Sequence, residues 1–347
     1  MLAACFVRPN CSKLAYSGSA RTLHREHLRE VEDESIREVV KLQEDIGLQG
    51  ITDGELRRDY WHLDFLTRIG GVVFEEGHNP LKWHRQDGVQ LEWVPPEVKV
   101  HGRITRPHPI QVKDFEFVES ITSRTAKVCI PSPSMMIVQG GEKIIDPNVY
   151  PDRDQFFGDL SRAYAEEVAD LSRAGCRYLQ LDDTFLAFLC DDGIGAAMGR
   201  SNEDTQRMAR LSARLINDAI RGQPKDMAVC IHLCRGNYQS SWLSQGGYDP
   251  IAEILLAEIA VDGYFLEYDD ERSGDFAPRV SYRRARRSCS ASSALNLPNS
   301  NPGMLSSGAL TTRRKSCRSS NLQSARNADF HRPRKVTLSL STTREKN

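Results

Sequence analysis

Residues 178–183 read Tyr-Leu-Gln-Leu-Asp-Asp, a short apolar run that ends in two acidic side chains. A run of this length with polar residues at its end is typical of a strand buried in a parallel sheet. Helical periodicity predicts an amphipathic helix before it, over 154–174, and another after it, over 203–221. Strand and helix therefore alternate around 178–183, which favours an α/β fold with a parallel sheet or barrel.

The same alternation extends toward both ends of the chain. Further strands are predicted over 48–55, 126–130, 228–233 and 263–268, and further helices over 31–46 and 250–260. Residues 72–120 interrupt this rhythm with two Trp residues, a Pro-Pro pair and a predicted strand at 97–104. We interpret this segment as an excursion between two barrel units, in the form of a β-hairpin that covers a site.

Charge divides the chain into three parts. Residues 279–347 hold 15 Lys and Arg against two acidic residues, whereas the rest of the chain carries a balance of -14, and no acidic residue precedes Glu26. We therefore predict a non-matching segment over 1–27, a barrel domain over 28–278, and a basic tail over 279–347. The tail has 14 Ser and no apolar period. It is expected to be disordered or translated out of frame; a nucleic-acid-binding arm is the alternative.

Composition limits the location of the protein. No apolar run reaches the roughly 18 residues that a membrane span needs. Nine cysteines without a secretory signal are typical of reduced thiols or metal ligands, which predicts the cytoplasm. Residues 1–25 are basic and acid-free, as mitochondrial targeting segments are, and an incorrect start site explains the same pattern.

Side chains that can take part in catalysis or binding lie at the ends of five consecutive predicted strands. They are Glu55, then Ser132 and Ser134, then Asp182 and Asp183, then His232 and Cys234, and then Glu267 and Asp269. The carboxyl ends of the strands of an α/β barrel form one rim, so residues distant in sequence meet there. One acidic residue after one strand carries little weight, but this repetition predicts an active site at the rim of a (β/α)8 barrel.

His232 and Cys234 give the sharpest local pattern. Positions i and i+2 of an extended segment project to the same side, so an imidazole and a thiolate can share one cation. Nitrogen and sulfur ligands suit Zn²⁺, and Glu267 follows the next strand. The alternative is a buried cysteine beside a hydrogen-bonded histidine.

Two carboxylates and a turn form a second group. Glu55 and Asp182 at a barrel rim can hold a substrate ammonium or act as acid and base, although Asp182 is also suited to capping a helix. The Pro-Ser-Pro-Ser turn that contains Ser132 and Ser134 can present backbone N–H groups to a ligand, or it is only a turn.

Five motifs in this order resemble the catalytic domain of cobalamin-independent methionine synthase, in particular its shorter single-domain relatives. The resemblance covers roughly 28–278. The motifs are Thr52-Asp-Gly-Glu55, Ile130-Pro-Ser-Pro-Ser-Met135, Tyr178-Leu-Gln-Leu-Asp-Asp183, Ile231-His-Leu-Cys-Arg-Gly-Asn237 and Tyr264-Phe-Leu-Glu-Tyr-Asp269.

The resemblance implies a zinc-dependent methyl transfer at the barrel rim. His232, Cys234 and Glu267 would be zinc ligands, Glu55 and Asp182 would bind the amino group of homocysteine, and the Pro-Ser-Pro-Ser turn would lie near the folate. The family moves a methyl group from N5 of methyltetrahydrofolate, commonly a polyglutamate, to the homocysteine sulfur. A free thiol has a pKa near 8.5, and zinc removes its proton. The sequence names no acid for the leaving nitrogen.

The sequence also departs from the family pattern. Gly18-Ser19 does not follow a convincing first strand, and the pattern ends after Pro278, before the last two strands and the cysteine that completes the family's zinc site. We therefore expect an incomplete barrel and an impaired or inactive chain. The alternatives are another thiol or methyl donor on the same barrel, or a retired barrel whose tail binds nucleic acid. The tail disfavours the last, because Tyr282 and Phe330 are its only aromatic residues.

Overall fold

The structure is a computed structural model that describes residues 18–85, 87–238, 241–268 and 271–274, with side chains from residue 26 onward. All of the described residues belong to one compact unit. The predicted tail over 279–347, most of the segment 1–27, and Asp269 lie outside the described residues.

The described strands are short and alternate with helices along the chain. The strands are β1 (Gly50–Ile51), β2 (Gly70–Glu75), β3 (Leu81–His84), β4 (Gln90–Trp93), β5 (Glu97–Thr105), β6 (Thr125–Ala126), β7 (Val128–Pro131), β8 (Tyr178–Asp183), β9 (Ala228–Leu233) and β10 (Gly263–Leu266). The α-helices are α1 (Gly18–Asp45), α2 (Leu63–Leu66), α3 (Val112–Ile121), α4 (Arg153–Arg173), α5 (Phe185–Phe188), α6 (Asp192–Ala197) and α7 (Asn202–Ile220). The shorter helical turns are η1 (Pro133–Ile137), η2 (Gly141–Ile144), η3 (Asp249–Ile251), η4 (Ile254–Glu258) and η5 (Glu271–Ser273).

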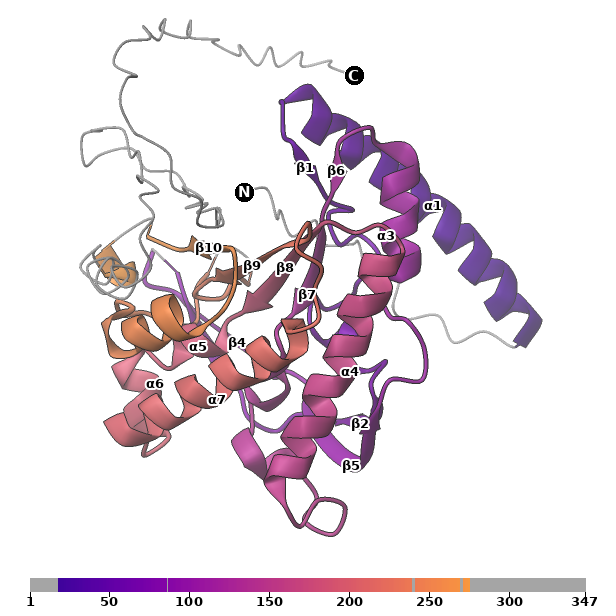
Figure 1. Ribbon diagram of the computed structural model, residues 1–347. Helices are drawn as coiled ribbons and strands as arrows, with labels where there is room; N and C mark the ends of the chain where they lie inside the picture. Colours follow the sequence, from indigo (N-terminus) through magenta and orange to yellow (C-terminus); the bar gives the residue numbers. More distant parts are fainter. Residues whose placement is uncertain (1–17, 86, 239–240, 269–270, 275–347) are drawn as a thin grey trace, which may run out of the picture. The chain divides into compact units, whose positions relative to one another are not determined.

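The central sheet is parallel and has the order β10-β9-β8-β7 (Figure 1). Its register pairs Asp182 with Pro131 on one side and with His232 on the other, so the ends of the three strands lie level. β6 precedes β7 by one residue and pairs in parallel with β1. The N–H of Lys127 between them donates to the carbonyl of Ile51 at 2.8 Å. The chain therefore forms five consecutive parallel strand positions in the described residues.

The helices α4 and α7 pack against each other. Leu160, Tyr164 and Val168 are buried at helical spacing along α4, as the sequence predicts. After α4 the chain turns at Gly175, whose φ of 104° suits a residue without Cβ. Burial of these apolar side chains is the main source of stability for the sheet and its helices. No helix in the described part of the chain is both long and apolar enough to span a membrane.

The structure confirms an α/β fold with parallel strands. Within the described residues β1 and β10 each pair with a single neighbour, so the sheet has two edges there and closure into an eight-stranded barrel stays a prediction.

The excursion predicted over 72–120 contains two antiparallel pairs, β2 with β5 and β3 with β4, and after Thr105 it continues into the helix α3. The predicted strand at 97–104 is β5. The β3–β4 hairpin is bonded to the loop after β9, because the N–H of His84 donates to the carbonyl of Trp242 at 2.7 Å and the reverse bond is 2.9 Å long. The hairpin is therefore attached to the segment that follows Cys234.

Two predicted helices differ in the structure. The helix predicted over 31–46 starts at Gly18, and while Ile36 and Val40 are buried, Val31 and Ile46 are half exposed, so they do not share one buried face. The helix predicted over 250–260 is a continuous helical run over 249–258, which begins as the 3-10 turn η3 and ends as the π-helix η4. Pro250 lies in its first turn, where the N–H that proline lacks would have no partner within the helix.

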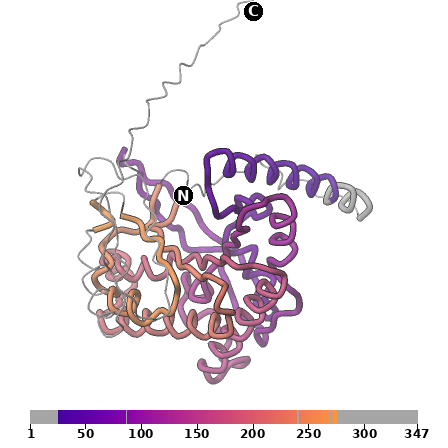
Figure 2. Tube along the Cα trace, turned by 45° about the horizontal axis from the view of Figure 1, so that its top comes forward, coloured from indigo at the N-terminus to yellow at the C-terminus, as the bar shows by residue number. Residues whose placement is uncertain are grey.

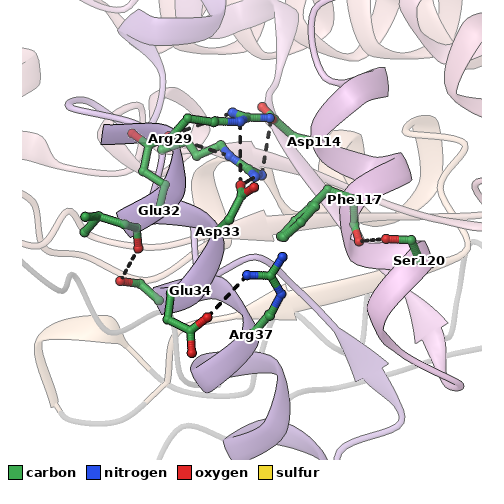
Figure 3. Close-up of polar contacts among 11 residues, drawn as sticks. Arg29, Glu32, Asp33, Glu34, Arg37, Asp114, Phe117 and Ser120 are labelled. Atoms are coloured by element: carbon green, nitrogen blue, oxygen red, sulfur yellow. Dashed lines mark hydrogen bonds and ion pairs between the residues drawn. The ribbon is translucent and has the colours of Figure 1, made fainter. Parts of the chain in front are cut away.

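Charged side chains join α1 to α3, which lie side by side (Figures 1 and 2). Figure 3 shows Arg29 reaching Asp114 on α3, with 3.2 Å between the Nη2 and Oδ1 atoms. Arg57 also pairs with Asp114 at 3.4 Å and with Asp33, and its guanidinium lies 4.6 Å from the ring centre of Phe117. This network fixes the turn after β1 to two helices.

Candidate active site

Asp182 and His232 meet at the ends of β8 and β9. The Nδ1 atom of His232 lies 3.0 Å from Oδ1 of Asp182, and both side chains are 12% exposed. Their strands pair these residues directly, so the contact follows from the register of the sheet. The Nε2 atom of His232 is buried and has no hydrogen-bond partner among the described residues. A histidine held by a carboxylate through one nitrogen, with the other nitrogen free, has the arrangement of a metal ligand.

A row of hydrogen bonds supports this pair from the strands beside it. The Nε2 atom of Gln180 donates to Oδ1 of Asp182 at 2.6 Å, and Nζ of Lys127 donates to Oε1 of Gln180 at 2.6 Å. Gln180 and Asp182 are two residues apart on β8 and so face the same side of the sheet. The row therefore fixes the Asp182 carboxylate before it meets a ligand.

Glu55 lies in a strained turn after β1. Its φ of 58° is left-handed, a conformation that costs a non-glycine residue of order 1–3 kcal/mol and is common at functional sites. The N–H of Glu55 donates to Oδ1 of Asp53 at 2.9 Å. The guanidinium of Arg58 lies 3.4 Å from Oε1 of Glu55 and donates to the carbonyl of Cys129 at 2.6 Å. The turn is thus tied to β7.

Removal from water raises the pKa of the Glu55 carboxyl to about 7, and the negative charges of Asp182 and Asp53 act in the same direction. The positive Arg58 opposes this rise. Oxygens of Glu55 and Asp182 and the Cys129 sulfur all lie within 4.8 Å of one another. The structure thus brings the two predicted carboxylates together, where a bound cation such as an ammonium would stabilise both charged forms.

The second acid of the Asp-Asp pair faces the opposite way. Asp183 is 1% exposed, and its Oδ2 atom accepts hydrogen bonds from both Ser132 and Ser134. Its Oδ1 atom accepts from the N–H of Leu186 at 2.7 Å. The hydroxyls of the Pro-Ser-Pro-Ser turn therefore hold the turn against β8. Their role in binding substrate stays a prediction.

Cys234 and Glu267 follow β9 and β10. Removal from water raises the pKa of the Cys234 thiol to about 12, so a charged partner is needed to hold it as a thiolate. The Oε1 atom of Glu267 lies 2.7 Å from Nη2 of Arg272, and its Oε2 atom accepts the N–H of Arg235 at 2.8 Å. Both oxygens of this carboxylate are therefore engaged.

The predicted ligands His232, Cys234 and Glu267 are not assembled around one point. Across the described residues, the group of three possible ligands within 4.8 Å of one another is Glu55, Cys129 and Asp182. The free Nε2 atom of His232 fits a zinc ligand, and Cys234 supplies the sulfur that zinc prefers. Glu267 fits in its chemistry but is bound to Arg272. The zinc site therefore stays a prediction.

Several contributors to the site were not predicted. They are Lys127, Gln180, Arg58 and Arg272, whose contacts depend on side-chain directions that the periodicity of the sequence does not give. A weak signal existed for Gln180, which lies two residues before Asp182 in the same strand. Arg57 and Arg58 are both buried, with side chains 4% and 6% exposed, and both form ion pairs.

Aromatic side chains form a row beside the loop that follows Cys234. Trp93 on the β3–β4 hairpin stacks on Tyr60 and on Tyr238, with ring centres 5.8 and 5.6 Å apart. Trp83 contacts Tyr238 from the other side, with ring centres 5.5 Å apart. Tyr60 is 41% exposed, so one end of the row is open to a ligand.

A parallel α/β sheet with polar side chains at its carboxyl edge defines a class of enzymes whose active site lies at the strand ends. The sequence profile described as cobalamin-independent synthase, catalytic domain, matches residues 12–245. The match begins inside the segment 1–27 that was set apart on composition.

Relatives and solved structures agree with this profile. The uncharacterized protein YxjG of Bacillus subtilis is 40% identical over 275 residues, which cover 77% of this chain and 69% of that protein. A 5-methyltetrahydropteroyltriglutamate–homocysteine methyltransferase of Thermosynechococcus vestitus is 30% identical over 171 residues, 49% of this chain and 20% of that protein. The solved structure of a putative vitamin-B12-independent methionine synthase from Listeria monocytogenes is 32% identical, with a TM-score of 0.53, and covers 74% of this chain and 71% of that one. The chain belongs to the cobalamin-independent methionine synthase family, and its family is one of methyltransferases.

Proposed function

We propose that this chain transfers a methyl group from a methyltetrahydrofolate-type donor to the thiol of an amino acid of the homocysteine type, at a zinc site made by His232, Cys234 and Glu267. The observation that carries the proposal is His232, whose Nδ1 atom is held by Asp182 while its buried Nε2 atom has no partner among the described residues. When bound, zinc would lower the pKa of the acceptor thiol so that it reacts as a thiolate.

Glu55 and Asp182 would bind the ammonium group of the acceptor. An ammonium between them favours ionised Glu55, whose pKa burial raises to about 7 in the free protein. Asp182 would then have two functions, because it also orients His232. Such a shared carboxylate would place the amino group, and through it the sulfur, at a fixed position relative to the metal ligands.

The aromatic row would bind the flat ring of the methyl donor. Tyr60 and Trp93 stack with an angle of 21° between their planes, and the exposed face of Tyr60 offers a surface for a further ring. The row joins the hairpin to the loop after β9, so a donor held there would lie near the ends of the strands.

A comparison of acceptors tests this proposal. We expect the full-length protein, although impaired by its departures from the family pattern, to methylate homocysteine, detected as methionine by mass spectrometry, and to be at least tenfold less efficient with 4-mercaptobutanoate, which lacks the amino group. Glu55→Gln should raise KM for homocysteine about tenfold and leave KM for 4-mercaptobutanoate unchanged. Glu258→Gln, at an exposed ion pair 3.8 Å from Arg210, is the matched control. Equal efficiency with both thiols would reject the ammonium site, and methylation of neither would reject the reaction.

A further inference from the structure

Among the three predicted metal ligands, Glu267 is the one that forms an ion pair with an arginine, Arg272. Its Oε1 atom lies 2.7 Å from Nη2 of Arg272, with side chains 18% and 16% exposed. Its Oε2 atom accepts the N–H of Arg235 at 2.8 Å. Because this N–H belongs to the backbone next to Cys234, it can remain bonded to one oxygen while the other binds a cation. Arg272 occupies that other oxygen.

The side chain of Arg272 has a second neighbour. Its guanidinium carbon lies 4.8 Å from the ring centre of Trp242, a distance at which a cation is attracted to the face of an indole. The backbone of Arg272 is fixed independently, since its carbonyl accepts the N–H of Gly246 at 2.7 Å. The position of the segment 271–273 therefore does not depend on the Arg272–Glu267 ion pair alone.

We propose that Arg272 is a positioning residue that holds Glu267 in the metal-free protein and is exchanged for zinc, so that it sets the zinc affinity of the site. This inference rests on the proposed zinc site. Two cations that need the same carboxylate oxygen bind in competition, and removal of one strengthens binding of the other.

A zinc titration measures this competition. Metal-free full-length protein is titrated with zinc against a chromophoric chelator, as the natural chain and as Arg272→Ala, Arg272→Lys and Arg177→Ala. The last is a matched control, because Arg177 forms an ion pair of the same length, 2.7 Å, with Asp226 away from the site. We expect Arg272→Ala to tighten the zinc Kd about tenfold and Arg272→Lys to tighten it less, since lysine keeps the charge but loses the planar fork. Arg177→Ala should leave it unchanged.

Tryptophan fluorescence gives a readout that does not depend on activity. If zinc frees Arg272 from Glu267, the guanidinium shifts relative to the Trp242 ring and the emission changes as zinc is added. We expect this change in the natural chain and its loss in both Arg272→Ala and Trp242→Phe. An unchanged emission in the natural chain during saturating zinc binding would overturn the exchange.

The outcomes separate this inference from the proposed function. One zinc per chain with the same Kd in the natural protein and in Arg272→Ala, or a weaker Kd in the variant, overturns the role of Arg272 and leaves the zinc site standing. No zinc in any folded variant removes both. If the circular dichroism spectrum shows that Arg272→Ala is misfolded, Arg272→Lys takes its place in the test. The inference then holds only if Arg272→Lys binds zinc with a lower Kd than the natural protein.

Discussion

His232, within the last two residues of β9, and Glu267, directly after β10, lie at the ends of neighbouring strands, yet His232 has a free binding atom and Glu267 does not. His232 is oriented by Asp182 and keeps its Nε2 atom free of any partner in the described chain, whereas both oxygens of Glu267 are bonded. β9 lies between two strands, and β8 supplies the aspartate that orients the histidine. β10 has one described neighbour, and the group that meets Glu267 on the other side is an arginine from the chain just after it.

This difference indicates that a side chain at the end of one strand is oriented for binding by a residue of the neighbouring strand, as Asp182 on β8 orients His232 on β9. At β9, a hydrogen-bonded row from Lys127 through Gln180 to Asp182 fixes the ligand and leaves its binding atom open. At β10, the edge of the described sheet, the cation of Arg272 pairs with the partly buried carboxylate instead, because an unpaired charge out of water is costly. The predictions below test this contrast.

The largest expected effect concerns the two faces of β8. Asp183→Ala removes a buried carboxylate and leaves the hydroxyls of Ser132 and Ser134 without their acceptor. We expect the free energy of unfolding to fall by about 3 kcal/mol in urea titrations, because hydrogen bonds to buried charged groups are strong. The zinc Kd of the folded protein should not change. A large change in Kd with unaltered stability would show that Asp183, and not Asp182, serves the site.

The next effect concerns the orientation of His232. Asp182→Asn keeps the shape of the side chain but weakens its hold on Nδ1, and loss of such a partner costs metal affinity of about 10–100-fold. The zinc Kd should therefore weaken by that factor, opposite in sign to the change expected for Arg272→Ala. Equal zinc Kd values for Asp182→Asn and the natural chain would show that Asp182 does not prepare His232 for binding, and the contrast between His232 and Glu267 would be wrong.

A third effect depends on pH. Because burial raises the pKa of Glu55 from 4.5 to about 7 in the folded chain, the folded state binds this proton more readily than the unfolded state. The contribution of Glu55 to the free energy of unfolding is then largest below about pH 4.5 and is lost as the pH rises to about 7. Homocysteine binding should change in the other direction and tighten about tenfold from pH 6 to pH 8.

Glu55→Gln should remove both pH dependences, since glutamine does not titrate. Urea titrations and calorimetric binding of homocysteine, each at several pH values, measure the two trends. A binding curve that keeps its step near pH 7 in Glu55→Gln would assign the titration to another group.

The smallest effect lies at the far end of the hydrogen-bonded row. Lys127 bonds Gln180, and its ammonium lies 5.1 and 5.0 Å from the ring centres of Tyr178 and Phe265. Lys127→Met keeps the packing but removes the charge, so we expect a loss of about 1 kcal/mol in stability and at most about a threefold weaker zinc Kd. A loss as large as that of Asp182→Asn would mean that the lysine charge itself acts on the site.

The spacing of apolar residues predicted the helices and strands that bury one face and end at a glycine or an acidic residue. The spacing of Leu160, Tyr164 and Val168 predicted α4, and the run 178–183 is β8. The long excursion gave only one clear strand, because β2, β3 and β4 are short and partly exposed. The π-helix η4 was missed because its apolar residues also suit an α-helix.

The candidate site was predictable where the sheet alone positions a side chain. Parallel strands bring Glu55 and Asp182 together and pair Asp182 with His232, and both follow from strand order. The Arg272–Glu267 pair was not predictable, because the direction of a side chain after the end of a strand depends on loop geometry and not on periodicity.

Metal content tests the central claim most directly. The full-length protein is purified with zinc present, passed over a desalting column and measured by atomic emission, as the natural chain and as His232→Ala, Cys234→Ala and the control Cys176→Ala, a buried thiol outside the site. If His232, Cys234 and Glu267 form one zinc site, we expect about one zinc per chain in the natural protein and in the control, and almost none in the two ligand variants. A folded natural protein without zinc, or zinc retained in both ligand variants, would contradict the account.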